Sequence, residues 1–171
     1  MTAIERADRK DIRALSRKLL TLFEDKNSQI YKENVTKFGI PEEYVRKAFA
    51  EETLLEAATK GKTVFYLALE NAEIIGFAQT IQKDASTVEL DRIIIFPPHA
   101  GKGIGTQLLR RVLVEQEQRE IYTVIVNTGK EETQARRFYE KNGFKQMKEV
   151  TVEAPWGKKL SLVTYKFQVK R

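Results

Sequence analysis

The stretch Leu90–Leu113, LDRIIIFPPHAGKGIGTQLLRRVL, decides how this chain folds. It opens with an apolar run that ends at Phe96, is broken by Pro97 and Pro98, and continues through three glycines into apolar positions at helical spacing. We therefore predict a strand, a glycine turn and a helix. Glycine lets the backbone approach a ligand closely, and the first turn of a helix offers unpaired N–H groups at the positive end of its dipole. A phosphorylated cofactor is the partner that this arrangement predicts.

Upstream of this stretch the pattern predicts a strand, two helices and a hairpin. Asp8 stands where the N-cap of the first helix is expected, and Pro41 opens the second helix in its first turn. The segment between the two helices carries Asn, Ser and Gly and is predicted to be irregular. The predicted elements are a strand at Thr2–Arg6, a helix from about Lys10 to Glu24, an irregular segment at Asp25–Ile40, a helix from Pro41 that ends by Lys60, and strands at Thr63–Leu69 and Ile74–Lys83.

Downstream the pattern predicts a strand from Thr87, the glycine turn, a helix to about Arg119, a strand at Ile121–Val126, a helix at Glu131–Asn142, and strands at Phe144–Val152 and Leu160–Val169. Hairpins alternate here with crossover helices, and no repeat or linker interrupts the chain. We expect one domain over residues 1–171, of the α+β (α/β) class. Its mixed, mostly antiparallel sheet has about seven strands and helices on both faces.

The composition excludes several classes of function. The chain has no cysteine and one histidine, so we expect no disulfide framework, no thiolate nucleophile and no metal site. No continuous apolar stretch is long enough to span a bilayer, and the N-terminus lacks the apolar block of a signal peptide, so the predicted location is cytoplasmic. The net charge of +6 fits a nucleic acid or an anionic cofactor equally well. Because Lys and Arg are mixed with Glu along the chain, nucleic acid is disfavoured.

The glycine turn has three lookalikes. A P-loop needs Lys and then Ser or Thr after its last glycine, whereas Thr106 and Gln107 follow Gly105 here. A dinucleotide-binding turn needs a later third glycine near the start of a βαβ unit. The third alternative is a merely structural turn, but three glycines in five residues, with Lys102 among them, exceed what such a turn requires. Anion binding is the favoured interpretation.

At this point the sequence resembles a known family. HAGKGIGTQLL after LDRIIIFPP is similar to the acetyl-CoA-binding motif of the GNAT acyltransferases, and ARRFYEKNGF at Ala135–Phe144 is similar to the family's second signature. The resemblance extends over nearly the whole chain, with a PaiA-like, polyamine-acetylating branch as the nearest relation. It implies the GNAT-type fold, acetyl-CoA as cosubstrate and N-acetyltransferase activity.

The resemblance also implies where acetyl-CoA binds. Pantetheine is expected to pair with the backbone of the strand, and the thioester is expected where this strand splays from Ile121–Val126. The pyrophosphate is expected on the backbone of the turn and the helix start. The implied cofactor-binding residues are Ile93, Ile95, Gly101, Lys102, Gly103, Ile104, Gly105 and Thr106. Two positions depart from the family pattern, Ala100 in place of Arg or Gln and Glu132 in place of Asn, and a polar contact to the cofactor is expected to be lost at each.

Acetyl transfer to an amine needs a base, because an alkylammonium with a pKa of about 10.4 is protonated at pH 7. Glu89 and Asp91 alternate on the strand, so their side chains share one face. The resemblance implies Glu89 as the first candidate for the base and Asp91 as the second; alternatively, both pair with neighbouring Lys or Arg. Tyr139 resembles the family's tyrosine that donates to the leaving sulfur; alternatively, it packs beside Phe138.

The family's acceptor site lies between the first two helices and the hairpin before the last strand. An acidic groove with aromatic walls would attract a cationic amine. The candidate lining residues are Glu24, Asp25, Glu42, Glu43, Glu51, Glu52 and Glu56, with Tyr31, Phe38, Phe49 and Trp156 as walls. We therefore predict direct acetyl transfer to a primary amine, a small polyamine-like amine first and a protein N-terminus or lysine second. The alternatives are a catalytically degenerate CoA-binding regulator and a basic nucleic-acid-binding module. A homodimer is the oligomeric state that we consider.

Overall fold

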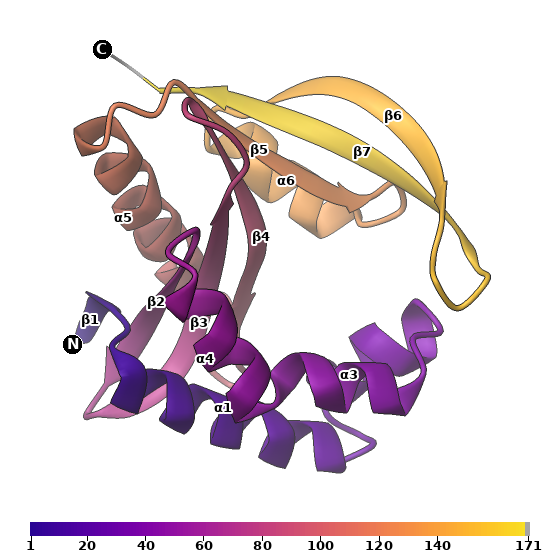
Figure 1. The fold of residues 1–171 in the computed structure, drawn as a ribbon. Coiled ribbons are helices and arrows are strands. Elements are labelled where there is room, and N and C mark those ends of the chain that lie inside the picture. The colour runs from indigo at the N-terminus through magenta and orange to yellow at the C-terminus, as the bar shows by residue number, and fades with distance from the viewer. Residues whose placement is uncertain (170–171) are drawn as a thin grey trace.

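A single seven-stranded sheet organises the protein (Figure 1). The structure, a computed structural model, describes residues 1–169. The strand order is β1-β2-β3-β4-β5-β7-β6, and β4–β5 is the one parallel pair among neighbouring strands of residues 1–169. The elements are β1 Thr2–Arg6, α1 Arg9–Glu24, α2 Gln29–Tyr31, the π-helix η1 Lys32–Lys37, α3 Glu42–Phe49, α4 Glu51–Thr59, β2 Thr63–Glu70, β3 Glu73–Gln82, β4 Thr87–Ile95, α5 Ile104–Gln118, β5 Thr123–Gly129, α6 Thr133–Lys141, β6 Lys145–Glu153 and β7 Lys159–Gln168. The predicted fold class is confirmed.

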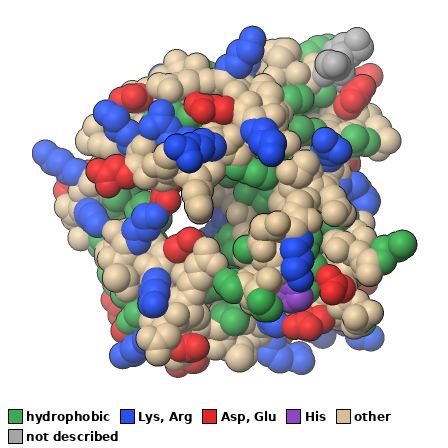
Figure 2. All heavy atoms as spheres, turned by 180° about the vertical axis from the view of Figure 1, so that it is seen from behind, with side chains coloured by type: hydrophobic (Ala, Val, Ile, Leu, Met, Phe, Trp, Pro, Cys, Tyr) green, Lys and Arg blue, Asp and Glu red, His purple; other side chains and the backbone are tan. Residues whose placement is uncertain are grey.

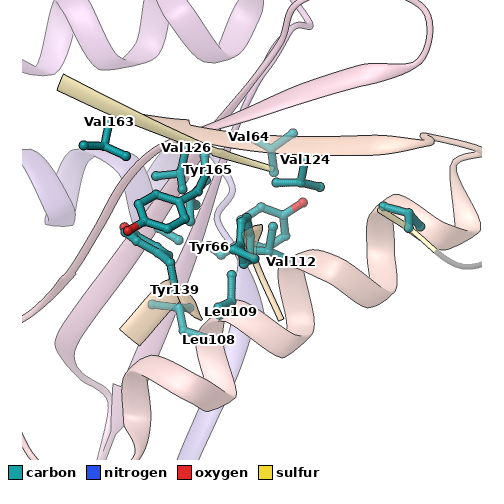
Figure 3. Close-up of a cluster of buried hydrophobic side chains, with 14 residues drawn as sticks. Val64, Tyr66, Leu108, Leu109, Val112, Val124, Val126, Tyr139, Val163 and Tyr165 are labelled. Carbon is teal, nitrogen blue, oxygen red and sulfur yellow. The ribbon is translucent and has the colours of Figure 1, made fainter. Parts of the chain in front are cut away.

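Helices cover both faces of the sheet, as predicted. Residues of β2 alternate between two cores: Phe65 and Leu67 pack with α1, α3 and α4, whereas Val64 and Tyr66 pack with α5. The second core continues to α6 through Tyr139, which lies beside Tyr165 of β7 (Figure 3). Because buried apolar residues alternate along the central strands, each face of this part of the sheet is sealed by a helix layer (Figure 1).

The N-terminal helices differ from the prediction in two places. The segment expected to be irregular forms α2, whose Ser28 hydroxyl accepts from the N–H of Tyr31, and then the π-helix η1. The helix expected from Pro41 is two helices, because Ala50 adopts extended backbone with φ −63° and ψ 143° between them. Pro41 is the N-cap of α3, one position outside the helix. The spacing of apolar residues predicts that a segment is helical, but it does not predict a π-helix or a single extended residue within the segment.

Strand β4 is irregular where it matters for the site. Its register with β3 shifts by one residue: Gln79 pairs with Arg92 and Thr80 pairs with Leu90, which leaves Asp91 without a partner as a β-bulge. Leu90 belongs to the α5 core and Ile93 packs against it, so Asp91 and Arg92 lie between them on the opposite face. The bulge thus places two consecutive charged residues on one side of the sheet.

Among residues 1–169, no helix has the length and apolarity that crossing a membrane would require.

Candidate active site

A gap opens between β4 and β5 halfway along the sheet. The two strands pair only from Thr87 to Glu89 on β4 and from Thr123 to Ile125 on β5, although β4 continues to Ile95 and β5 to Gly129. Parallel strands that stop pairing leave backbone groups free and a space between them. This is the splay at which the sequence analysis placed the thioester.

On the α5 side of the gap lies a cavity of about 420 Å³. Ile93 and Ile95 of β4, the glycine turn, and four side chains of α6 surround it. The lining residues are Ile93, Ile95, Ala100, Gly101, Gly103, Gly105, Thr106, Gln134, Ala135, Phe138 and Tyr139. Six of the eight predicted cofactor-binding residues line this cavity. Lys102 does not line it, and the Ile104 side chain is buried against Ala68 and Ile75, so Ile104 offers only its backbone.

The start of α5 is a free set of donors at one end of this cavity. Gly103 is the N-cap, in the left-handed region with φ 78°, and no side chain caps the helix. The first N–H groups of a helix have no partner within the helix, so they remain available to an anion. α1 differs, because the Asp8 carboxylate accepts from the Asp11 N–H at 2.8 Å in a capping box.

A second cavity, of about 380 Å³, lies on the opposite side of the gap. β4, β5, α6 and the η1 segment enclose it, and Asp91 and Arg92 of the bulge face it. The polar and charged lining residues are Gln29, Glu33, Asp91, Arg92, Asn127, Thr128, Glu132 and Gln134, with Tyr139 at the inner wall. We call this the acceptor cavity.

Tyr139 lines both cavities. Its ring packs against Phe138, Phe144 and Tyr165, and the residue is 7% exposed. Its hydroxyl makes no hydrogen bond to another residue of the described chain. Burial raises the pKa of Tyr139 to about 12, so the hydroxyl stays protonated at neutral pH. A protonated, unengaged hydroxyl at the wall between two cavities can donate a hydrogen bond to a bound group.

The two predicted base candidates occupy different surroundings. Glu89 accepts from the Asn127 amide at 3.2 Å and pairs with Lys83 at 3.4 Å, and it does not line the acceptor cavity. Asp91 faces the cavity, with Arg92 as its ion-pair partner at 3.8 Å. Burial raises the pKa of Asp91, and the charge of Arg92 only partly opposes this. Both carboxylates therefore have the cationic neighbours that the alternative interpretation expected, but Asp91 is the one that faces the acceptor cavity.

Arg92 is a site residue that the sequence analysis did not select. Its guanidinium lies 5.1 Å from the ring centre of Phe49, and its buried Nη1 atom has no hydrogen-bond partner. Burial lowers the pKa of Arg92. An unsatisfied buried donor on a charged group is costly, which makes a ligand partner favourable at this point of the cavity. Only the bulge, which no sequence pattern reports, brings Arg92 to this face.

None of the seven predicted acidic residues lines the acceptor cavity. The glutamates of the first helices are held by cations on outer surfaces: Glu24 and Glu42 by Arg46, Glu51 by Arg13, and Glu56 by Lys60. Of the aromatic wall candidates only Phe38 lines the acceptor cavity. The acidic lining of this cavity comes instead from Glu33 of η1, Asp91 of β4 and Glu132 before α6.

The two departures from the motif have different outcomes. Ala100 lines the first cavity, so a small apolar side chain stands where the pattern has a polar one. Glu132 turns to Lys37 of η1, with 2.6 Å between Oε2 and Nζ, and lines the acceptor cavity rather than the first one. This ion pair links α6 to the N-terminal helices across the mouth of the acceptor cavity.

Comparison with known proteins agrees with this geometry. The family model described as "Acetyltransferase (GNAT) domain" matches residues 61–146, which hold β2 to α6 and both cavities' central residues. The chain belongs to the GNAT acetyltransferase family. The GNAT match spans the β4 bulge, the glycine turn and Tyr139, so the three features that shape the gap lie inside the family's own region.

Relatives and solved structures extend the likeness to the whole fold. An uncharacterized N-acetyltransferase of Mycobacterium bovis is 29% identical over 90 residues, which are 53% of this GNAT chain and 58% of that protein. The matched region thus spans less than two thirds of the length of that relative. An N-acetyltransferase from Staphylococcus aureus has a TM-score of 0.74 at 21% identity, with 99% of each chain covered. PaiA N-acetyltransferase from Thermoplasma acidophilum, solved with coenzyme A, has a TM-score of 0.66 at 18% identity, with 98% and 99% covered. The PaiA-like branch stays a prediction.

Proposed function

We propose that this chain transfers an acetyl group from acetyl-CoA to a primary amine by direct attack. The observation that carries the proposal is the position of Tyr139, whose side chain lines both the cavity at the glycine turn and the acceptor cavity. Gln134 also lines both cavities, but it is exposed, whereas the Tyr139 hydroxyl is the buried donor between them. In the proposed reaction the sulfur of the thioester leaves beside this hydroxyl while the amine approaches from the acceptor cavity. Family membership and the neighbour solved with coenzyme A support the choice of acyl donor.

The first cavity offers separate contacts for the pyrophosphate and for the pantetheine of acetyl-CoA. The uncapped start of α5 supplies N–H donors for the pyrophosphate, and Gly101 and Gly103 leave open space above the backbone, with no heavy atom within 4 Å of an added Cβ. Ile93 and Ile95 offer an apolar strand beside which pantetheine can lie. Apolar walls with a few convergent donors are typical of cofactor sites.

The reaction then needs three events at the gap. A base takes the proton of the ammonium, and Asp91 is our first choice because its side chain faces the acceptor cavity; Glu89 is second. The neutral nitrogen forms a bond to the thioester carbonyl carbon, and the C–S bond breaks. The Tyr139 hydroxyl donates a hydrogen bond to the departing sulfur, which spreads the negative charge that develops there. The proton given up by the amine offsets the one that the coenzyme A thiol gains on leaving.

Two measurements test this proposal. Acetyl-CoA at about 100 times its Kd is expected to stabilise the folded chain by about 2.7 kcal/mol, seen as a raised melting temperature. Thiol release is then followed with a panel of amines: a polyamine, a peptide N-terminus and a peptide lysine. Absence of any shift at saturating acetyl-CoA contradicts the proposal. A shift without turnover of any amine favours the alternative of a CoA-binding regulator.

The amine panel covers both acceptors that the sequence predicts. A small polyamine-like amine was expected first, on the strength of an acidic lining that the acceptor cavity does not take from the first helices. A protein N-terminus or lysine was expected second. The cytoplasmic location and the homodimer likewise stay predictions.

A further inference from the structure

Arg92 faces the acceptor cavity as a charged group whose hydrogen-bond donors are unused. It is the one basic side chain among the described residues that line this cavity. Its Nε atom lies 3.8 Å from Oδ2 of Asp91, which is too far for a hydrogen bond, and its buried Nη1 atom has no partner. Within residues 1–169, no nitrogen of the guanidinium donates a hydrogen bond. The chain thus brings five N–H donors to the cavity and leaves them available.

The residues around the guanidinium hold it in place without satisfying it. Its carbon lies 5.1 Å from the ring centre of Phe49, which is 2% exposed. Gln79 is the cross-strand neighbour of Arg92 on β3, and residues that face each other in an antiparallel pair have side chains on the same face. The Gln79 Oε1 atom is also buried and has no partner in the described part of the chain. Neither the sheet nor α3 therefore supplies the acceptor that Arg92 needs.

Charges at the surface of the molecule have a weaker influence on a ligand. Figure 2, which views the molecule from behind, shows side chains of both charge signs around a hollow near its middle. Exposed charges are screened by water and salt, so each contributes little to binding. A buried guanidinium has lost its hydrogen bonds to water, and a ligand with matching acceptors replaces them. We therefore expect the acceptor to be selected at Arg92 rather than at the surface.

The other charges of the acceptor cavity favour an ammonium group beside the guanidinium. Glu33 bonds only to a neutral amide and keeps its charge, whereas Glu132 is paired with Lys37. Asp91, our first choice for the base, adjoins Arg92 on the bulge. A ligand that serves both has its amine and an anionic group close together. A carboxylate, with one negative charge, fits better than a phosphate, because Glu33 and Asp91 would repel a second negative charge.

We infer that the acceptor is a free α-amino acid whose carboxylate binds the Arg92 guanidinium while its amine faces Asp91. An α-amino acid carries both groups on one carbon atom, which suits a base and a guanidinium 3.8 Å apart. The cavity volume of about 380 Å³, near the lower end of the usual range for ligand sites, suits a small acceptor.

The inference rests on the proposed acetyl transfer and adds the class of acceptor. The reaction itself is unchanged: the amine nitrogen gains the acetyl group, coenzyme A leaves as the thiol, and the carboxylate takes no part. A polyamine and a polypeptide N-terminus lack a carboxylate beside the amine. Both acceptors predicted from the sequence are therefore expected to react more slowly than an amino acid.

The test adds amino acids and their amides to the amine panel. Alanine, leucine and phenylalanine are each compared with the corresponding amide by thiol release from acetyl-CoA. For at least one pair we expect kcat/KM of the free amino acid to be about 10–100 times that of the amide, the usual effect of a charge-assisted hydrogen bond. The amide has the more acidic ammonium, so this preference cannot arise from a more readily deprotonated amine. Equal rates within every pair, or faster reaction of spermidine or a peptide N-terminus, overturn the inference.

Two further amines test the anionic group and its distance from the amine. O-phosphoethanolamine carries a phosphate in place of the carboxylate, and 4-aminobutyrate has a longer chain between its amine and its carboxylate. Both are expected to react about tenfold more slowly than the best amino acid. Faster reaction of either one contradicts the assignment to an α-amino acid.

Arg92→Met is the decisive variant, because its apolar side chain can still pack on Phe49 and replaces a buried charge. It is expected to abolish the preference for the free amino acid over the amide and to leave the KM for acetyl-CoA unchanged. Any change in the basicity of Asp91 acts on both members of a pair and cancels in their ratio. Arg92→Lys keeps the charge but loses the planar set of donors, so it should retain only part of the preference.

Arg46→Met is the matched control. The Arg46 guanidinium also lies over a buried ring, 5.3 Å from the centre of Phe23, but it does not line the acceptor cavity. This variant is expected to keep the full preference for the free amino acid. If Arg92→Met keeps the preference as well, or if both variants lose it equally, Arg92 has only a structural role and the inference fails.

Binding without turnover separates this inference from the proposed function. Saturation-transfer NMR of the three amino acids with the chain and coenzyme A is expected to show binding of at least one, which its amide and the Arg92→Met variant both lose. If no amine is acetylated but this binding is observed, the proposed function fails and the carboxylate site at Arg92 stands. If amines are acetylated but no amino acid binds or reacts better than its amide, the inference fails and the proposed function stands.

Discussion

The two edges of β4 differ in how completely they are paired. On the β3 side, β4 is paired from Val88 to Ile95, interrupted only by the bulge at Asp91. On the β5 side the pairing stops at Glu89. The paired edge belongs to a sheet covered by helices on both faces, whereas the unpaired edge borders both cavities. The site thus lies where β4 and β5 stop pairing. Changes at the paired edge should therefore affect stability, and changes at the unpaired edge should affect ligand binding and the reaction.

The largest expected effect is on the paired edge. Phe77 of β3 is fully buried, pairs with Ile94 of β4 and contacts Phe96. Phe77→Ala is expected to lower the free energy of unfolding by about 3–5 kcal/mol, because a large buried ring leaves a cavity. Urea unfolding measures this. At a temperature where the variant is still folded, kcat per folded molecule should be nearly unchanged. A large loss of kcat would contradict the claim that the paired edge affects stability and not the reaction.

The next effect belongs to the unpaired edge. Tyr139→Phe removes the donor at the wall between the cavities and is expected to lower kcat about 10²–10³-fold, the usual effect of losing one donor to developing charge. Acetyl-CoA affinity should be unchanged by titration calorimetry. Tyr165→Phe is the control: its hydroxyl serves Arg136 and Glu140 and lines neither cavity, so it should alter stability and leave kcat close to wild type. Equal kcat for wild type and Tyr139→Phe would remove Tyr139 from the reaction.

The pH dependence of the reaction tests the base. Burial raises the pKa of Asp91, and a base must be unprotonated, so kcat/KM should fall as the pH is lowered through that raised pKa, tenfold per pH unit below it. Asp91→Asn should lose this acid limb together with most of the rate. Glu89→Gln, whose carboxylate is engaged by Asn127 and Lys83, should retain the limb. If Glu89→Gln loses the limb and Asp91→Asn keeps it, the roles are exchanged.

The smallest effect comes from a matched pair of glycines. Gly103 and Gly61 both have positive φ, 78° and 81°, and neither has a heavy atom within 4 Å of an added Cβ. Changing either to Ala is expected to destabilise the chain by about 1–2 kcal/mol through left-handed strain. Only Gly103→Ala should also weaken acetyl-CoA binding, about tenfold, because Gly103 lines the first cavity, at the glycine turn. Equal acetyl-CoA affinity in both variants would show that the turn does not contact the cofactor.

Periodicity and turn chemistry predicted most of the fold. Seven strands, the hairpin at Asn71 and Ala72 with their positive φ, the glycine turn and the α5 helix all lie where the sequence placed them, within a few residues. The spacing of apolar residues is visible in one chain, and so are the glycines of the turn, of which Gly101 and Gly103 have positive φ. Ala72, with φ 64°, carries no such signal. The residues assigned to acetyl-CoA came from the resemblance to the GNAT family; six of the eight line one cavity, and their role stays a prediction.

The acceptor side was not predictable from local patterns. Arg92 reaches its cavity through a bulge that exists only relative to β3. The β6–β7 hairpin meets η1 through Trp156 and Lys158, which donate to carbonyls more than a hundred residues away in the chain. Four of the acidic residues chosen from the first helices form ion pairs with Arg46, Arg13 and Lys60, and helical spacing does not report such partners. Such features depend on how distant segments meet.

The central claim is that acetyl-CoA binds along the unpaired edge of β4 and at the start of α5. Hydrogen exchange with and without coenzyme A tests it most directly, at early times when exchange reports local opening. We predict slower exchange in peptides covering Ile93–Thr106 and no change in peptides covering β3, whose amides are already paired. Unchanged exchange at Ile93–Thr106 with saturating coenzyme A, or protection centred on another segment, would contradict the account.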